Sequence, residues 1–248
     1  MIYLKNDEQL ALMREPCKIL RDALKLAGEH VKPGITTAQL DKIVYDYITS
    51  QDAYPSFLNY EGFPKSICAS IDEEVVHGIP SEKRYLEEGS IISLDVGVYK
   101  NGFHGDAART FPVGKISPEK QQLINVTKQS FFEAVKIIKE GVRLGDVGHA
   151  VDSYVTSFGY STVKVLVGHG IGHNLHEMPD VPNYGVPGRG LRLQAGMTIA
   201  IEPMVNMGDY RVEFLSDGWT CVTADRKPSA HYENTIAVTK DGCEILTL

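Results

Sequence analysis

At the centre of this chain stands the stretch Ile91-Ile-Ser-Leu-Asp-Val-Gly-Val-Tyr-Lys-Asn-Gly-Phe-His-Gly-Asp106. Its first ten residues alternate as in a β-strand, and Asn101-Gly102 is typical of a two-residue type I′ hairpin turn. With that turn, Gly97 lies opposite Asp106, and Asp95 points to the same face as Gly97. The two aspartates become diagonal neighbours about 7 to 8 Å apart, close enough for their carboxylates to converge on one cation. The alternative is a pair of solvated strand acids, which the apolar and Gly-rich surroundings disfavour.

Three further candidate metal ligands lie in the second half of the chain. His169 is flanked by small residues, which leave its imidazole room to approach a metal ion. Glu202 ends a short apolar strand, and Glu233 lies within another alternating strand. Taken singly, each has an ordinary structural interpretation as a core histidine or a strand-end charge. Together with Asp95 and Asp106 they form four carboxylates and one imidazole, too much negative charge for a dry sheet interior unless cations neutralise it.

This set of ligands favours a reactive site with two divalent ions over a structural zinc site. Cobalt, manganese, iron(II) and zinc all suit an oxygen-rich site with one nitrogen ligand, and the sequence does not choose among them. Two such ions lower the pKa of a bound water and polarise a carbonyl, so we expect hydrolysis. His77 and His176 are further histidines that could donate to a substrate carbonyl oxygen.

Two other motifs could indicate a different site, but the sequence supports them less well than the five-ligand metal site. Gly168-His-Gly-Ile-Gly172 lacks the spacing of a dinucleotide-binding loop and does not open a helix, which disfavours a Rossmann fold. His173 follows His169 by four residues, but the glycines between and around them disfavour the helix that would place both on one metal. We therefore do not expect His173 to be a ligand.

An internal repeat organises the rest of the chain. Residues 32–50 align with residues 139–157 at a constant offset of 107, and both copies carry an apolar stripe at helical spacing. A longer helical pattern precedes each copy, over residues 7–31 and 118–139, the second with Ser117 as its N-cap. Strand-rich stretches follow at 66–113 and 163–248, the last with a strand expected over 231–238.

These patterns predict an α+β fold. We expect two pseudo-symmetric helix-helix-sheet halves, about 1–115 and 116–248, which share a mostly antiparallel sheet within a single catalytic domain at 1–248. The helices would cover the outer face of the sheet. A chance match is the alternative to duplication, because this kind of connection between helices is common.

The composition is that of an ordinary globular protein, with 248 residues, 43% hydrophobic and 23% charged. The net charge of −7 argues against a nucleic-acid partner, which would require clustered Lys and Arg. No apolar run reaches the roughly 18 residues that span a bilayer, and no signal peptide is recognisable, so we expect no membrane contact and a cytoplasmic location. The four cysteines form no C-x-x-C pair and are expected to be reduced, mostly buried thiols.

With these motifs in place, the sequence resembles bacterial type I methionine aminopeptidases along essentially its whole length. The matching segments, in the family's order, are Glu74-Val-Val-His-Gly-Ile-Pro80, Ser93-Leu-Asp-Val-Gly97, Gly102-Phe-His-Gly-Asp106, Gly168-His-Gly-Ile-Gly172, Ala200-Ile-Glu-Pro-Met204 and the strand of Glu233. The resemblance implies the pita-bread (creatinase/aminopeptidase) fold, which agrees with the repeat. It also implies removal of the initiator methionine from nascent proteins.

The resemblance assigns roles to the candidate residues. It implies that Asp95 chelates one metal ion, that Asp106 and Glu233 bridge two ions, and that His169 and Glu202 complete the ligand set. Glu202 would also transfer the proton. By the same resemblance, His77 contacts the scissile amide and His176 stabilises the tetrahedral oxyanion.

A methionine pocket also follows from the resemblance, and its aromatic and apolar character suits a thioether side chain. Its residues would be Phe57, Tyr60, Phe63, Cys68, Leu175 and Trp219. Ordinary core packing is the alternative interpretation of this set. The chain departs from the family pattern at Asn234, where many relatives have His, and at Phe57, where some have Cys. Asn234 could alter the contacts that support the ligand Glu233, and Phe57 could alter the shape of the pocket.

Two alternative functions stay open. An Xaa-Pro dipeptidase or aminopeptidase P would use the same ligand types, but those relatives usually carry an N-terminal domain, whereas the first helix here begins by about residue 7. The 31 residues from Glu202 to Glu233 leave no space for the helical domain inserted in type II methionine aminopeptidases. A catalytically inert peptide-binding relative is the alternative from another class, and the presence of all five ligands disfavours it. The expected partners are the N-terminal methionine of nascent peptides and, transiently, the ribosome, with the protein a monomer.

Overall fold

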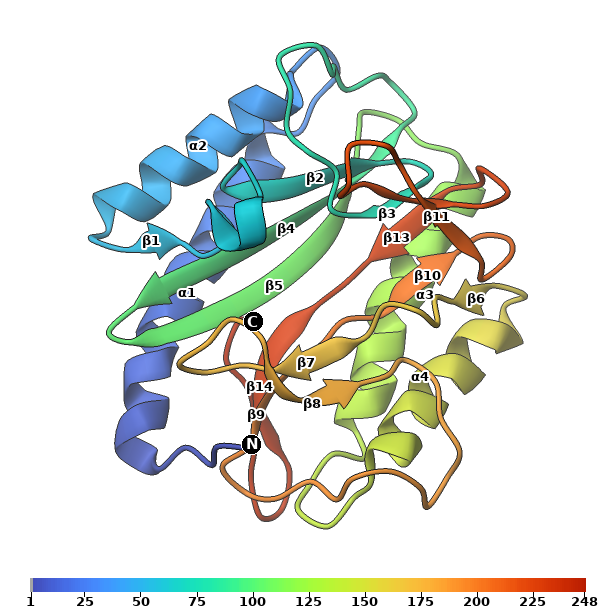
Figure 1. Ribbon diagram of the computed structural model, residues 1–248. Coiled ribbons are helices and arrows are strands. Elements are labelled where there is room, and N and C mark those ends of the chain that lie inside the picture. The colour runs from blue at the N-terminus through green and yellow to red at the C-terminus, as the bar shows by residue number, and fades with distance from the viewer. Residues whose placement is uncertain (1) are drawn as a thin grey trace.

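A long hairpin, β4 (Ile91–Lys100) and β5 (Phe103–Pro112), crosses the middle of the molecule in the computed structural model, which describes residues 2–248 (Figure 1). Asn101 and Gly102 have φ values of 56° and 82°, as a type I′ turn requires. Gly97 pairs with Asp106 across the two strands. The register predicted from the turn is therefore confirmed.

The chain forms two blocks, each with two α-helices followed by strands. The first block contains α1 (Asp7–His30), α2 (Thr37–Ser50), β1 (Tyr54–Pro55), the 3₁₀ helix η1 (Tyr60–Gly62), β2 (Ile67–Ile71), β3 (Glu74–Val76), β4 and β5. The second contains α3 (Pro118–Val135), α4 (Leu144–Ser157), β6 (Ser161–Thr162), β7 (Gly168–Gly170), β8 (Glu177–Val181), β9 (Thr198–Ile201), β10 (Met204–Asn206), β11 (Val212–Phe214), β12 (Cys221–Thr223), β13 (Ser229–His231), β14 (Asn234–Val238) and β15 (Cys243–Ile245). Each block thus places a helix pair before its main run of strands.

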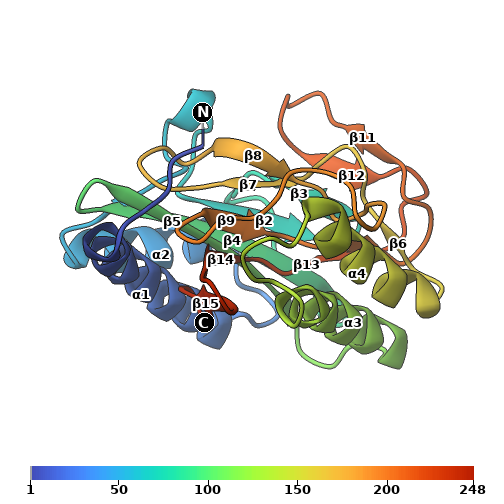
Figure 2. The same ribbon diagram turned by 90° about the horizontal axis from the view of Figure 1, so that it is seen from below.

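The four α-helices of the described chain lie on one side of the strands, with α1 beside α2 and α3 beside α4 (Figure 2). Helices α2 and α4 begin at residues 37 and 144 and end at 50 and 157, an offset of 107 at both ends. This matches the offset of the sequence repeat. Each pair covers its own cluster of buried apolar side chains, one containing Leu20 and Leu40 and the other Phe131 and Val151.

Helix α3 corrects one predicted boundary. Ser117 caps its N-terminus by accepting a hydrogen bond from the Lys120 amide, as expected. The helix ends at Val135, however, and not at residue 139. The amides of Ile137 and Ile138 donate to carbonyls three residues back, so the last turn tightens and the regular helix stops.

The two blocks of strands meet along β5. All the strand pairs formed by residues 2–248 are antiparallel, and they group into four small sheets. The Glu233 amide donates to the Ala108 carbonyl at 3.0 Å, and the His231 amide donates to Thr110 Oγ1 at 2.9 Å. The halves therefore share strands in two ways. First-half β3 pairs with second-half β12 in one small sheet, and hydrogen bonds link β5 to the β13–β14 segment.

Two further predictions concern thiols and membranes. All four cysteines are free, and Cys17, Cys68 and Cys221 are buried, which confirms the prediction of mostly buried thiols. Within residues 2–248, no helix combines the length and apolar character needed to cross a membrane.

A buried ion pair ties the N-terminal segment to β8. Lys5 Nζ lies 2.6 Å from Glu177 Oε2, and both side chains are 2% exposed. The Lys5 amide also donates to the Gly196 carbonyl at 2.7 Å. Burying two charges is costly, and their mutual attraction at this short distance offsets that cost. Loss of either partner would leave the other charge buried and uncompensated.

We expect Lys5→Ala to lower the free energy of unfolding by about 3 to 5 kcal/mol, because the Glu177 carboxylate would stay buried without its partner. Arg14→Ala is the matched control, since Arg14 pairs with Glu244 at 2.8 Å while their side chains are 48% and 42% exposed. That variant should change the free energy by no more than about 1 kcal/mol. Urea denaturation of both variants measures the difference, and equal losses would contradict the prediction.

Candidate metal centre

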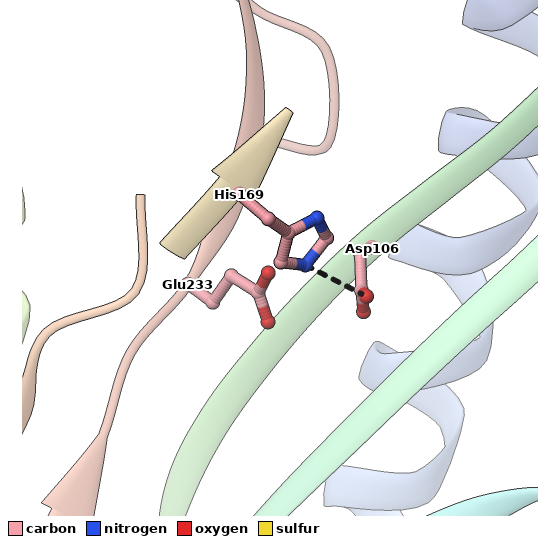
Figure 3. A group of neighbouring side chains, drawn as sticks. All are labelled: Asp106, His169 and Glu233. Carbon is pink, nitrogen blue, oxygen red and sulfur yellow. Dashed lines mark ion pairs between the residues drawn. The ribbon is translucent and has the colours of Figure 1, made fainter. Parts of the chain in front are cut away.

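Three predicted ligands converge in the space between β5 and the second half of the chain. Asp106 from β5, His169 from β7 and Glu233 from the segment between β13 and β14 point toward one another (Figure 3). One ligand atom from each lies within 4.8 Å of the others. His169 Nε2 is 3.8 Å from Asp106 Oδ2 and 3.8 Å from Glu202 Oε1. The structure thus joins Glu202 to this group.

Asp95, on β4, completes the predicted set. Its place diagonal to Asp106 follows from the observed pairing of Gly97 with Asp106. All five predicted ligands line one cavity of about 240 Å³, together with His77 and His176. These seven residues, which are spread from position 77 to position 233 of the chain, therefore line the same cavity.

The carboxylates of this group fit a bound cation. Asp95 Oδ1, Asp106 Oδ1 and Glu233 Oε1 are buried and have no hydrogen-bond partner among residues 2–248. A buried oxygen without a partner is destabilising by about 1 to 3 kcal/mol, and more if it is charged. Several such oxygens around one point are the arrangement that a divalent metal ion satisfies.

Electrostatics lead to the same conclusion. Burial raises the pKa of Asp95 to about 6 and that of Glu202 to about 8. Burial, followed by repulsion from neighbouring carboxylates, raises the pKa of Asp106 and of Glu233 well above the usual range. Bound cations would reverse both effects, because they stabilise the ionised carboxylates and displace their protons.

His169 is prepared to act as a nitrogen ligand. Burial lowers its pKa to about 3, so the imidazole is neutral. Its Nδ1 lies 2.9 Å from the carbonyl oxygen of Gly170, which can accept a hydrogen bond but not donate one. Nδ1 must therefore carry the proton, and Nε2 presents its lone pair to Asp106 and Glu202.

Paired interruptions in the strands place the two glutamates. Glu202 lies between β9 and β10, and Glu233 lies between β13 and β14. Because β9 pairs with β14 and β10 pairs with β13, the two interruptions face each other. The prediction of one continuous strand over residues 231–238 was wrong, since the two parts pair with different strands. The break frees Glu233 from the regular alternation of a strand.

An apolar wall adjoins the metal ligands. It includes all six residues of the predicted methionine pocket, namely Phe57, Tyr60, Phe63, Cys68, Leu175 and Trp219, which pack in one cluster and line the cavity. Phe63 and Trp219 meet edge to face at 5.1 Å between ring centroids. A Cβ at Gly97 would lie 2.8 Å from the Phe57 ring, so the glycine is needed to seat that ring.

Two histidines border the cavity beside this wall. His176 Nδ1 is 2.8 Å from the Tyr60 hydroxyl, and the His176 and His169 ring centroids are 4.2 Å apart. His77 has a φ of 61°, a left-handed conformation that is unusual for a side chain this large. Burial lowers the pKa of His77 to about 4. His173, in contrast, places Nδ1 2.9 Å from the Gly102 carbonyl oxygen at the hairpin turn.

Asn234 supports the chain beside Glu233, not its carboxylate. Asn234 Oδ1 accepts hydrogen bonds from Arg109 at 2.6 Å and from Thr247 Oγ1 at 3.0 Å. Arg109 also donates to the Glu233 carbonyl. Asn234 thus binds the same arginine that holds the backbone of the ligand.

Sequence reasoning missed some of the residues around the cavity. Those not predicted include Glu61, Val76, Leu166, Val167 and Met204, which line it. His231 was also missed, although it is fully buried with Nε2 3.6 Å from Glu202 Oε2. Strand alternation does not link it to Glu233, because the strand is interrupted between the two residues.

Comparison with known proteins identifies one family. Residues 11–240 match metallopeptidase family M24. The methionine aminopeptidase of Clostridium acetobutylicum is 54% identical over 248 residues, which cover 100% of this chain and 99% of that protein. The crystal structure of methionine aminopeptidase from Rickettsia prowazekii matches with a TM-score of 0.98 at 42% identity and covers 100% of both chains. The pita-bread fold implied by the resemblance is confirmed.

A more distant likeness concerns the fold alone. Xaa-Pro dipeptidase from Bacillus anthracis matches with a TM-score of 0.79 at 23% identity. The match covers 98% of this chain but 61% of that protein.

We expect Glu202→Gln to stabilise the metal-free protein at high pH. Folding raises the Glu202 pKa from 4.5 to about 8, so the stabilisation by its protonated form is complete below pH 4.5 and is lost as the pH rises through 8. Glutamine stays neutral throughout. Urea denaturation in chelator should show a gain of roughly a few kcal/mol at pH 8.5 and little change at pH 5. A gain of the same size at both pH values would contradict this origin.

Proposed function

This chain belongs to metallopeptidase family M24, and since it matches methionine aminopeptidases over its whole length, we propose that it removes the initiator methionine from newly made proteins. The observation that carries the proposal is the joint lining of one cavity by the five metal-ligand candidates and the apolar wall. That arrangement suits an enzyme that holds an apolar side chain beside a hydrolytic metal centre.

We propose that Asp95, Asp106, His169, Glu202 and Glu233 would hold two divalent ions. When bound, such ions activate a water molecule and polarise the scissile carbonyl. The unpartnered carboxylate oxygens and the neutral His169 support this assignment. Cobalt, manganese, iron(II) or zinc would satisfy the same ligands.

Glu202 is the proposed proton-transfer residue. Its carboxylate lies at the cavity beside His169, and burial raises its pKa to about 8. A carboxyl with a raised pKa can accept a proton from the attacking water and return it to the leaving amine near neutral pH.

His77 and His176 are the proposed contacts to the reacting amide. The Tyr60 hydroxyl fixes the His176 ring through Nδ1, which leaves Nε2 for the oxygen of the tetrahedral intermediate. His77 borders the same cavity and is assigned to the scissile amide. Tyr60 holds the His176 ring before the substrate arrives, which is what stabilisation of developing charge requires.

The apolar wall is the proposed methionine pocket. Aromatic edges and the Cys68 thiol surround a small cavity, and a flexible thioether packs well against such groups. Contact with the ribosome, the monomeric state and the cytoplasmic location stay predictions from the sequence. The same holds for the single domain with its internal duplication.

Release of free methionine tests the proposed function directly. Chelator-treated protein should regain cleavage of Met-Ala-Ser on addition of Co²⁺, Mn²⁺ or Fe²⁺, and it should leave Leu-Ala-Ser and an Xaa-Pro peptide intact. Cleavage of the proline peptide alone would instead support an Xaa-Pro peptidase. Bound metal without cleavage of any peptide would favour an inert peptide-binding relative.

Two variants should separate metal binding from catalysis. Asp106→Ala is expected to remove bound metal and to lower turnover more than about a hundredfold, because it deletes a proposed metal ligand at the centre of the cluster. His176→Ala should lower kcat by about 10²- to 10³-fold and leave the metal content unchanged. Elemental analysis and steady-state kinetics of both variants provide the comparison. Full activity of Asp106→Ala would overturn its role as a ligand, and unchanged turnover of His176→Ala would remove its role in catalysis.

A further inference from the structure

His231 lies behind the metal centre, at the end of β13. Its side chain is 2% exposed, and Nε2 lies 3.6 Å from Glu202 Oε2. Neither of its ring nitrogens has a hydrogen-bond partner among residues 2–248. A buried imidazole without partners is destabilising, so a histidine at this position calls for an explanation beyond packing.

The backbone of His231 is fixed on both sides. Its amide donates to Thr110 Oγ1, and its carbonyl accepts from the same hydroxyl, each at 2.9 Å. The β13 strand also pairs His231 with Met204, two residues after Glu202. The fold therefore holds the backbone of His231 beside Glu202, and the side chain is buried there.

The Glu202 carboxylate lies between two imidazoles. Its Oε1 faces His169 Nε2 at 3.8 Å, and its Oε2 faces His231 Nε2 at 3.6 Å. His169 Nδ1 holds the proton of that ring, so His169 cannot donate to Glu202 through Nε2. His231 is free to carry its proton on Nε2, since no other acceptor in the described chain claims it.

We propose that His231 is a positioning residue, which donates a hydrogen bond from Nε2 to Glu202 Oε2 and so keeps Oε1 turned toward His169 and the metal centre. The bond requires the two atoms to approach from 3.6 Å to the roughly 2.9 Å of such a bond. The inference rests on the proposed function, in which Glu202 is both a ligand and the proton-transfer residue. Hydrogen bonds that orient metal-binding carboxylates typically change affinity or activity by about 10- to 100-fold.

A pair of substitutions separates this role from packing. His231→Gln keeps an N–H donor on a side chain of similar reach, whereas His231→Leu fills similar space without a donor. Mn²⁺ binding to the chelator-treated full-length protein, measured by calorimetry, is the readout besides activity. We expect His231→Leu to weaken Mn²⁺ binding and to lower kcat by about 10- to 100-fold each, with little change in KM for Met-Ala-Ser, and His231→Gln to restore both within about threefold.

A thermodynamic cycle identifies the partner. In a Glu202→Ala background, His231→Leu should no longer weaken Mn²⁺ binding, because the group through which it acts is absent. Should His231→Leu not fold, as judged by circular dichroism, His231→Met provides the same comparison with a more adaptable side chain. The inference would be overturned if the Gln and apolar variants had equal Mn²⁺ affinity and kcat. It would also be overturned if His231→Leu weakened Mn²⁺ binding as much in the Glu202→Ala background as in the wild type. Wild-type protein that binds Mn²⁺ but releases no methionine would count against the proposed function alone.

Discussion

Mutual repulsion among buried carboxylates is the constraint on which this structure depends. Asp95, Asp106, Glu202 and Glu233 face one small cavity, and three of the four leave an oxygen without a hydrogen-bond partner within residues 2–248. Burial raises the pKa of each carboxyl, so the ionised cluster opposes folding until cations neutralise it. Metal binding and folding are therefore coupled, and the rest of the protein has to hold these side chains together against their repulsion.

The fold provides that restraint at the junction of its two halves. The first half contributes its aspartates from one rigid hairpin, whose turn sets their register. The second half contributes His169, Glu202 and Glu233, and the glutamates lie at facing interruptions of paired strands. Backbone hydrogen bonds across β5 lock the halves in place, and the helices cover the opposite side of the strands. Neither half contains the whole set of ligands.

Two chemically different sets of residues surround the carboxylate cluster. One wall is aromatic and apolar, and Gly97 makes room for the Phe57 ring within it. Behind the carboxylates lie polar groups that act on their orientation. Arg109 donates to the Glu233 carbonyl and to Asn234, and His231 lies beside the side chain of Glu202. Substrate binding and metal chemistry thus use adjacent but chemically distinct surfaces of one cavity.

Local sequence determined much of this protein. The Asn101-Gly102 turn set the register of the hairpin, and apolar spacing located the helices, because turn geometry and helical periodicity act over a few residues. Residue chemistry and family resemblance also identified the five ligand candidates. Tertiary structure decided what depends on distant partners. It broke the strand at Glu233, gave Asn234 its contact with Arg109 and placed His231 against Glu202. These outcomes rest on hydrogen bonds and packing between segments far apart in the chain, and no local pattern encodes them.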